Sequence, residues 1–184
     1  MKLSDISWAI NLSESDAQQG HYLSYPSKEQ MILGETARFT SIIRNGLSPQ
    51  TFPVPDFPAR AFVCERKSGT GKVKVGFVTF QKASILPEYC INEIHQISVA
   101  SVFRGKGIGS VILDHTIQCL SSESEGIYGR CLPDSKIMMS MIERRNFDLA
   151  AETRETSYFV RGTYEQKEKF KHVIRTVLEK VLIN

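Results

Sequence analysis

A glycine-rich segment between a β-rich run and a helical run constrains the fold of this chain more than any other feature of its sequence. The run 92–100 ends just before Arg-Gly-Lys-Gly-Ile-Gly, residues 104–109, and residues 111–120 continue with helical spacing of apolar side chains. Three closely spaced glycines allow a tight turn and expose successive N–H groups at the positive end of the following helix. Such a turn suits a phosphate or pyrophosphate, and Arg104 and Lys106 add charge that can face the same anion.

The other patterns along the chain predict the fold class α+β. The expected elements are, in order, a helix over 27–46, a hairpin of strands 61–65 and 72–81, a strand over 92–100, a helix over 111–120, a strand over 126–131, a helix over 134–145, a strand over 157–161 and a helix over 164–182. Four prolines within residues 48–58 predict an exposed loop. The first 25 residues are rich in Ser, Asp and Gln, and leave a loose arm and short helical turns as equal alternatives.

The composition is that of an ordinary globular protein and excludes several classes. With 184 residues, 41% hydrophobic and 23% charged, the chain is long enough for one domain with a full core. Its longest apolar stretches are far shorter than the roughly 20 residues that cross a bilayer, so no membrane partner is expected. Asp5 lies where a signal peptide would have its apolar region, which favours a cytoplasmic protein.

Charge and cysteine spacing exclude two further kinds of site. The net charge is +3, but the last 24 residues hold six of the 23 Lys and Arg and three of the 20 Asp and Glu, so the rest of the chain is neutral. A nucleic-acid partner is not expected, since it needs a basic face on the folded body. The cysteines are far apart and form no C-x-x-C pair, so neither a metal site nor a redox motif is expected; they are Cys64, Cys90, Cys119 and Cys131.

The final segment, 164–182, predicts an amphipathic helix. Its apolar side chains recur every three or four residues, with Lys and Glu on the opposite side. These side chains are Phe170, Val173, Ile174, Val177, Leu178, Val181 and Leu182. The stripe packs either on its own domain or against a second copy in a homodimer.

The spelling of the glycine-rich segment argues against two familiar nucleotide loops. A Walker A loop ends in Lys followed by Ser or Thr, which is absent here. A dinucleotide-binding fingerprint is G-x-G-x-x-G near the start of a βαβ unit, whereas residues 105–109 spell G-x-G-x-G and follow a hairpin.

The stretch Val99–Leu113 resembles motif A of the GNAT superfamily of N-acetyltransferases. The signature of that motif is Arg or Gln, two free positions, Gly, one free position, and Gly or Ala; Arg104, Gly107 and Gly109 fill its three fixed positions. The resemblance covers residues 27–161 and implies a mixed, mostly antiparallel central sheet flanked by helices.

The resemblance also implies how the chain is divided. It predicts a GNAT-like domain over 1–162, in which residues 1–26 form either a loose arm or short helical turns. An additional C-terminal helix over 163–184 is expected to lie on this domain or at a dimer interface.

Acetyl-coenzyme A is the cosubstrate that the resemblance implies. The loop would hold the pyrophosphate, and the pantetheine arm would pair with the end of the preceding strand like an added strand. The implied binding residues are Ile97, Ser98, Val99, Arg104, Gly105, Lys106, Gly107, Ile108, Gly109 and Ser110, with Ser135 at the start of a later helix.

Acetyl transfer to an amine needs a base, because an ammonium group must lose its proton before it attacks the thioester. Glu93 lies 11 residues before Arg104, close to the offset at which the histone acetyltransferase branch of the family carries its glutamate base. His95 is two residues further along the same strand and is the second candidate. A structural salt bridge or a hydrogen-bonded core position is the alternative for both residues.

The leaving thiolate takes up a proton, and the sequence leaves its donor open. Residues 135–147 are similar to motif B of the family, but only Phe147 matches outright, and Ile142 occupies the position of the tyrosine that many relatives use. Tyr128 is the candidate donor, with Tyr158 and Ser135 as alternatives. Cys131 as an acylated nucleophile is disfavoured, because the sequence shows no His partner for it.

The expected function is transfer of an acyl group from a coenzyme A thioester to a primary amine of a small molecule or peptide. The resemblance places the acceptor against residues 27–58 and 150–156, without identifying it. A non-catalytic acyl-coenzyme A-binding or regulatory module and an acyl-homoserine lactone synthase-like enzyme are the alternatives.

Overall fold

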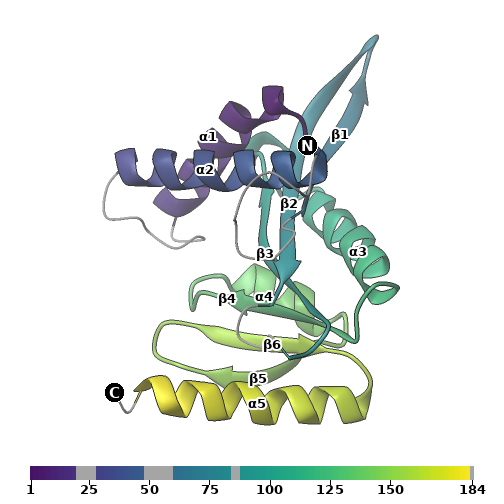
Figure 1. Cartoon of the computed structure of the whole chain (residues 1–184). Coiled ribbons are helices and arrows are strands. Elements are labelled where there is room, and N and C mark those ends of the chain that lie inside the picture. The colour runs from purple at the N-terminus through teal and green to yellow at the C-terminus, as the bar shows by residue number, and fades with distance from the viewer. Residues whose placement is uncertain (20–27, 48–59, 84–87, 183–184) are drawn as a thin grey trace. The chain divides into compact units, whose positions relative to one another are not determined.

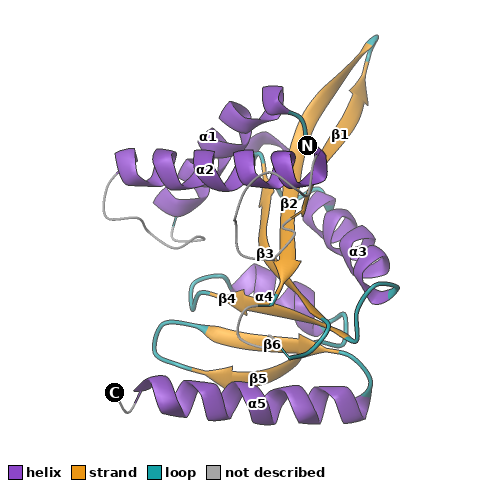
Figure 2. Cartoon of the chain, in the orientation of Figure 1, coloured by secondary structure: helices purple, strands orange, loops and turns teal. Residues whose placement is uncertain are grey.

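The structure, a computed structural model, describes residues 1–19, 28–47, 60–83 and 88–182 and is a mixture of helices and strands (Figures 1 and 2). Its elements are η1 Leu3–Asp5, α1 Ile6–Gln18, α2 Lys28–Leu47, β1 Arg60–Ser68, β2 Gly71–Lys82, β3 Ile91–Val99, η2 Ser101–Phe103, α3 Ile108–Ser121, β4 Gly126–Cys131, α4 Lys136–Glu143, β5 Asp148–Glu152, β6 Ser157–Arg161 and α5 Tyr164–Leu182. The strands follow the order β1-β2-β3-β4-β6-β5 in a six-stranded sheet. The predicted fold class is confirmed: the sheet is mostly antiparallel, with a parallel pair at β3 and β4.

The chain divides into two compact units that share β3 and α3. Unit 1 consists of Met1–Gln81 and Gln96–His115, and unit 2 of Lys82–His95 and Thr116–Asn184. The predicted boundary at residue 162 stays a prediction. The predicted proline-rich loop over 48–58 lies outside the described residues.

The N-terminal residues of unit 1 form a helix with a buried face. Ala9, Ile10 and Leu12 of α1 belong to one apolar cluster with Phe39 of α2 and Phe77 of β2. The two phenylalanine rings meet edge to face, with centroids 5.5 Å apart. Of the two alternatives for this segment, the loose arm is wrong for residues 6–18, because α1 contributes to the core of unit 1.

The hairpin of unit 1 is confirmed. β1 and β2 pair antiparallel from Arg60 opposite Phe80 to Ser68 opposite Gly71, with one shift of register between Cys64 and Glu65. Near the chain start, the Lys74 ammonium forms an ion pair with the buried Asp5 carboxylate at 2.6 Å, which ties β2 to η1.

Unit 2 is built around β4, which pairs with its neighbours on both sides. The first residues of β3, Ile91–Ile94, run parallel to Gly126–Gly129, and β6 runs antiparallel to β4 on the other side. β5 pairs antiparallel with β6. The sequence analysis did not predict β5, and the reason is its composition: Asp-Leu-Ala-Ala-Glu lacks the β-branched and aromatic residues that mark strands.

The C-terminal amphipathic helix is confirmed as α5, and its apolar side packs within unit 2. Phe170 and Ile174 are fully buried in a cluster with Tyr128 and Val160. α5 contacts β5 and β6. The side chains of Val181 and Leu182 lie outside the described residues, and a homodimer stays a prediction.

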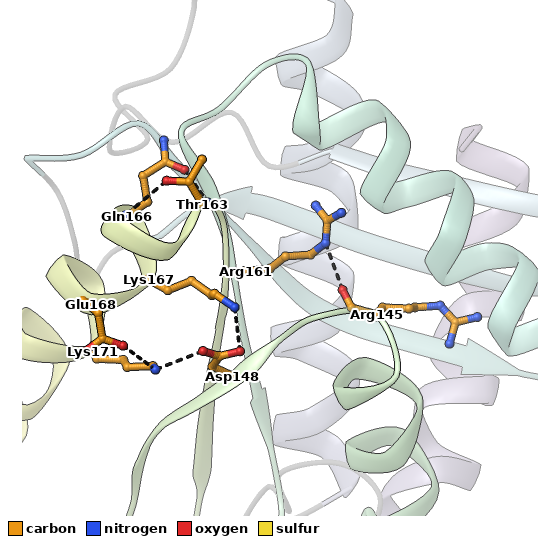
Figure 3. A network of polar contacts seen from close by, with 8 residues as sticks. All are labelled: Arg145, Asp148, Arg161, Thr163, Gln166, Lys167, Glu168 and Lys171. Atoms are coloured by element: carbon orange, nitrogen blue, oxygen red, sulfur yellow. Dashed lines mark hydrogen bonds and ion pairs between the residues drawn. The ribbon is translucent and has the colours of Figure 1, made fainter.

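Polar contacts hold the start of α5 (Figure 3). Thr163 and Gln166 form a reciprocal cap: the Thr163 N–H donates to Gln166 Oε1 at 2.8 Å, and the Gln166 N–H donates to Thr163 Oγ1 at 3.3 Å. Asp148 at the start of β5 accepts hydrogen bonds from Lys167 at 2.7 Å and Lys171 at 3.0 Å. These ion pairs lower the pKa of the Asp148 carboxyl, chiefly through Lys167.

Among the described helices, none has both the length and the apolar character needed to span a bilayer.

Candidate anion site and catalytic residues

The glycine turn of unit 1 has the backbone geometry that its sequence predicts. Gly105 and Gly107 have φ angles of 71° and 75°, which side-chain-bearing residues adopt only with strain. A Cβ built at either glycine would meet no heavy atom within 4 Å. The glycines are therefore needed for backbone conformation, and the space beside them is open.

This turn leads directly into α3. The N–H of Val111 donates to Gly107 O at 3.1 Å, so the helical hydrogen-bond pattern begins at the second positive-φ glycine. The first N–H groups of a helix have no intrahelical acceptor and lie at the positive end of the helix dipole. Gly105, Lys106 and Gly107 are exposed, which leaves this end of α3 accessible to an anion.

The two cationic side chains of the turn contact the chain itself. The Arg104 guanidinium donates through Nε to the Val99 carbonyl at 2.8 Å, and its two other nitrogens contact Gln19 and the Asp16 carboxylate. Lys106 Nζ donates to the Val102 carbonyl at 3.0 Å. The sequence predicts that both charges face a bound anion; in this structure they face protein acceptors, and that role stays a prediction.

A buried polar network in unit 1 includes Ser98, one of the predicted pantetheine-binding residues. Gln96 donates from Nε2 to Ser98 Oγ and to Ser13 Oγ, both at 2.9 Å, and accepts at Oε1 from Arg38 at 2.7 Å. Arg38 also donates to Thr79 Oγ1 at 2.9 Å.

The carboxylate of Glu35 balances the positive charge of Arg38 in this network. Glu35, fully buried on α2, pairs with Arg38 one turn later on the same helix. Ile97 and Val99 are half-buried on either side of the buried Ser98. Sequence reasoning missed Arg38, Glu35 and Gln96, which lie in segments of mixed polar and apolar residues and therefore carry no distinct signal.

The predicted base Glu93 is paired with an arginine in unit 2. Its carboxylate is 2% exposed; Oε1 accepts a hydrogen bond from Arg130 Nε at 2.9 Å and forms an ion pair with Nη2 at 2.8 Å. Although burial alone would lower the pKa of Arg130, the adjacent Glu93 raises it above its ordinary value. The salt-bridge alternative for Glu93 is therefore present in the structure. Its role as a base stays a prediction.

The predicted proton donor Tyr128 lies opposite Glu93 in the β3–β4 register and is buried. Its ring stacks on that of Tyr158 with centroids 6.3 Å apart. Burial raises the pKa of Tyr128 far above its ordinary value, partly opposed by the positive charge of Arg130. A phenol in this position holds its proton tightly.

The other candidates for proton transfer lie on β3, β4 and α4. His95 is half-buried on β3, and the half-buried Ser135 precedes α4, where it makes no side-chain capping bond. Ile142, at the position of the family tyrosine, is buried on α4. Burial raises the pKa of Cys131 to about 12, so its nucleophilic thiolate is scarce near neutral pH. Within the described ranges, no cluster of His, Cys, Asp and Glu that could hold a metal ion occurs.

Comparison with known proteins identifies the fold through structure alone. No protein-family model and no curated protein matches the chain. PaiA N-acetyltransferase from Thermoplasma acidophilum, solved with coenzyme A, is 11% identical, with a TM-score of 0.64 over 88% of this chain and 95% of that one. An N-acetyltransferase from Staphylococcus aureus Mu50 is 18% identical, with a TM-score of 0.64 over 88% and 94%.

A third similar structure is a spermidine N-acetyltransferase from Vibrio cholerae in complex with CoA and spermine. It is 13% identical, with a TM-score of 0.61 over 88% of this chain and 91% of that one. Further similar structures include a putative acetyltransferase of the GNAT family and a GCN5-related N-acetyltransferase. The chain therefore has the GNAT fold, and the fold implied by motif A is confirmed.

Proposed function

We propose that the chain is an acyl-coenzyme A-dependent N-acyltransferase of the GNAT superfamily. The observation that carries the proposal is the glycine turn before α3, which combines two positive-φ glycines, open space beside them and the start of a 14-residue helix. Two of the similar structures were solved with coenzyme A, which supports the same ligand class here.

The proposed cosubstrate site uses mainly backbone groups of unit 1. N–H groups between Gly105 and Ser110 would bind the pyrophosphate, for which the exposed end of α3 is suited. The pantetheine amides would pair with Ile97–Val99, which lie beyond the part of β3 that pairs with β4, residues Ile91–Ile94. Ser135, a residue of unit 2, stays a predicted binding residue.

The proposed reaction is direct aminolysis of the thioester. The amine nitrogen attacks the acyl carbon, a C–N bond forms, the C–S bond breaks and coenzyme A leaves as a thiolate. The amine loses one proton to the base, and the thiolate takes one up from a donor or from water. Because a thiol has a pKa near 8.5, it can leave without a strong acid.

Glu93 is the proposed base, and Arg130 fixes the orientation of its carboxylate. A hydrogen bond from Arg130 Nε and an ion-pair contact from Nη2 both end on Oε1 and hold the carboxylate in one orientation. Proton uptake is then assigned to Oε2, directly or through a water molecule. His95 on the same strand is the alternative base.

The proton donor is proposed from two stacked tyrosines of unit 2. Tyr128 has the required hydroxyl, but its burial favours retention of the proton. Tyr158, stacked on it and only half-buried, is the alternative on the neighbouring strand. Cys131 is not assigned a covalent role, because it is buried and its pKa is raised.

The proposed acceptor is a primary amine of a small molecule or peptide. The similarity to a spermidine acetyltransferase supports an amine acceptor in general terms. Part of the predicted acceptor region, 48–58, lies outside the described residues, and residues 150–156 include most of β5 and the turn after it. A cytoplasmic location and a homodimer remain predictions.

A non-catalytic acyl-coenzyme A-binding module is the second candidate, and two observations favour it. Ile142 is a buried core residue where many relatives have tyrosine, and Glu93 is engaged by Arg130. The lactone synthase-like alternative has no such support and conflicts with the glycine-rich motif A.

A thiol-release assay separates these functions. Purified protein is incubated with acetyl-coenzyme A and a panel of amines, peptides and homoserine derivatives, and free coenzyme A is followed with a thiol reagent. Amine-dependent release supports the transferase. Binding of coenzyme A without release for any acceptor favours the module, and dependence on acyl-carrier protein favours the synthase.

A further inference from the structure

The first fixed residue of motif A has an arrangement that its sequence position does not reveal. Arg104 begins the glycine turn, yet its guanidinium donates hydrogen bonds to three acceptors of unit 1. Its side chain is 31% exposed, while that of its ionic partner Asp16 is 9% exposed. The pair is thus partly shielded from water.

The contacts of Arg104 join the start of the turn to the end of β3 and to α1. The bond from Nε to the Val99 carbonyl, at 2.8 Å, links the start of the glycine turn to the last residue of β3. The remaining nitrogens contact Asp16 in the last turn of α1 and Gln19 just after it. Three bonds in a planar guanidinium fix both its position and its orientation.

The element that receives these contacts is itself anchored. Ala9, Ile10 and Leu12 hold α1 in the apolar cluster of unit 1, and Ser13 is bonded to Gln96 at 2.9 Å. Asp16 is one turn further along the same buried face. The guanidinium is therefore attached to a packed helix rather than to an exposed loop.

We infer that Arg104 is a positioning residue, and that the Arg104–Asp16 pair holds the glycine turn in its anion-binding conformation. α1 thereby becomes part of the cosubstrate site without touching the cosubstrate. The consequence for coenzyme A rests on the proposed function, whereas the consequence for the turn does not.

Replacement of Asp16 distinguishes this role from direct anion contact by the sign of the effect. If Arg104 contacts the pyrophosphate, Asp16→Asn removes a competing negative charge and coenzyme A binds more tightly. If Arg104 positions the turn, the same change loosens the turn and the Kd for coenzyme A rises by about tenfold, the scale of a lost hydrogen bond to a charged group. Isothermal titration calorimetry measures the Kd.

A second readout needs no ligand. In the unliganded Asp16→Asn protein, we expect faster hydrogen exchange at the amides of Arg104 and Val111, which donate to Ser101 O and Gly107 O on either side of the turn, and unchanged exchange in β4 and β6. Glu14→Gln is the matched control, since it removes one carboxylate from the same helix two residues away, and both measurements should match the wild type. If Asp16→Asn does not fold, Gln19→Ala removes the Arg104 contact and a hydrogen bond to Ser15 Oγ at an exposed position, and should show a smaller change of the same sign.

The outcomes separate the two proposals. Faster exchange at the amides of Arg104 and Val111 supports the positioning role even if coenzyme A does not bind to the wild type, a result that would reject the proposed function alone. Unchanged exchange, or tighter binding of coenzyme A by Asp16→Asn, overturns the positioning role.

Discussion

In each unit an arginine near a predicted functional residue is paired with a buried carboxylate, and the two pairs have different consequences for function. In unit 1, Arg104 pairs with Asp16 beside the glycine turn; in unit 2, Arg130 pairs with Glu93 on β3. The first pair engages a cation that the sequence predicts to bind an anion, and the second engages a carboxylate that it predicts to act as a base. The comparison teaches that the anion site depends on backbone conformation, whereas the predicted chemistry depends on how one side chain is held.

The largest expected effect concerns the core that supports unit 2. Ile174→Asp places a carboxylate where the side chain is fully buried, at a cost of several kcal/mol, a large part of an ordinary stability of about 5–15 kcal/mol. We expect loss of cooperative unfolding in circular dichroism. His172→Asp, at an exposed position of the same helix, is the control and should change stability by about 0.5 kcal/mol or less. A folded, monodisperse Ile174→Asp protein would show that this face of α5 is not core.

The next effect tests the backbone side of the comparison. Gly107→Val puts a β-branched residue at a φ of 75° and fills the open space beside the turn. We expect the thermal stabilisation by millimolar acetyl-coenzyme A to disappear. Gly71→Ala is the control, because a Cβ there makes only an ordinary contact of 3.8 Å with Ser68 O. Retained affinity of Gly107→Val for acetyl-coenzyme A would show that the glycine segment is a turn that does not bind the ligand.

The side-chain part of the comparison is tested at Glu93. If this carboxylate is the base, Glu93→Gln lowers turnover by about 10² to 10⁴-fold with little change in the Kd for coenzyme A. The loss should shrink at high pH, where more acceptor amine is already neutral. His95→Gln is compared in the same assay, and a larger loss there would transfer the role to His95.

The Glu93→Gln substitution also tests the structural role of the Glu93–Arg130 ion pair. Arg130 is 39% exposed at its side chain, so water can take over part of its hydrogen bonding. We therefore expect Glu93→Gln to stay folded. An unfolded variant would mean that the salt bridge is the main role of Glu93.

The sequence predicts the glycine turn well and the two ion pairs poorly, for a physical reason. The turn is made by consecutive residues whose type dictates the backbone angle, as at Gly105 and Gly107. Asp16 and Arg104 are 88 residues apart, so their contact depends on the packing of α1.

The sequence patterns of α1 and β5 hide these two elements, each for a specific reason. In α1, the polar residues Ser13 and Asp16 interrupt the apolar period of the buried face. They can be buried there because Ser13 is hydrogen-bonded to Gln96 and Asp16 to Arg104. In β5, the short run of Ala between Asp and Glu has no strand signal, and the strand forms through pairing with β6 and packing under α5.

A smaller effect is expected at the stacked tyrosines of unit 2. Because burial raises the pKa of Tyr128, Tyr128→Phe should lower turnover less than Tyr158→Phe if a tyrosine protonates the leaving thiolate. Steady-state kinetics of both variants with the same acceptor decide. A larger loss in Tyr128→Phe would assign it as the donor despite its burial, and equal turnover in both would assign the proton to solvent.

The smallest effect is on stability at the start of α5. Lys167 and Lys171 lower the pKa of Asp148, so its folded value is below the unfolded one, and the stabilisation is present above the unfolded pKa of about 3.9 and lost as pH falls through the folded value. Since the carboxylate is 35% exposed, Asp148→Asn should cost about 1 kcal/mol or less at pH 7. Urea unfolding across pH should show the two proteins converging in acid; a constant difference would contradict the ion-pair explanation.

Titration of the ¹⁵N-labelled wild-type protein with coenzyme A tests the central claim most directly. Amide spectra report on the turn itself, and the backbone resonances of Gly105, Gly107 and Gly109 are expected to shift saturably at one equivalent. Absence of shifts at millimolar coenzyme A, or shifts confined to residues outside the turn, would contradict the assignment of this turn as the cosubstrate site.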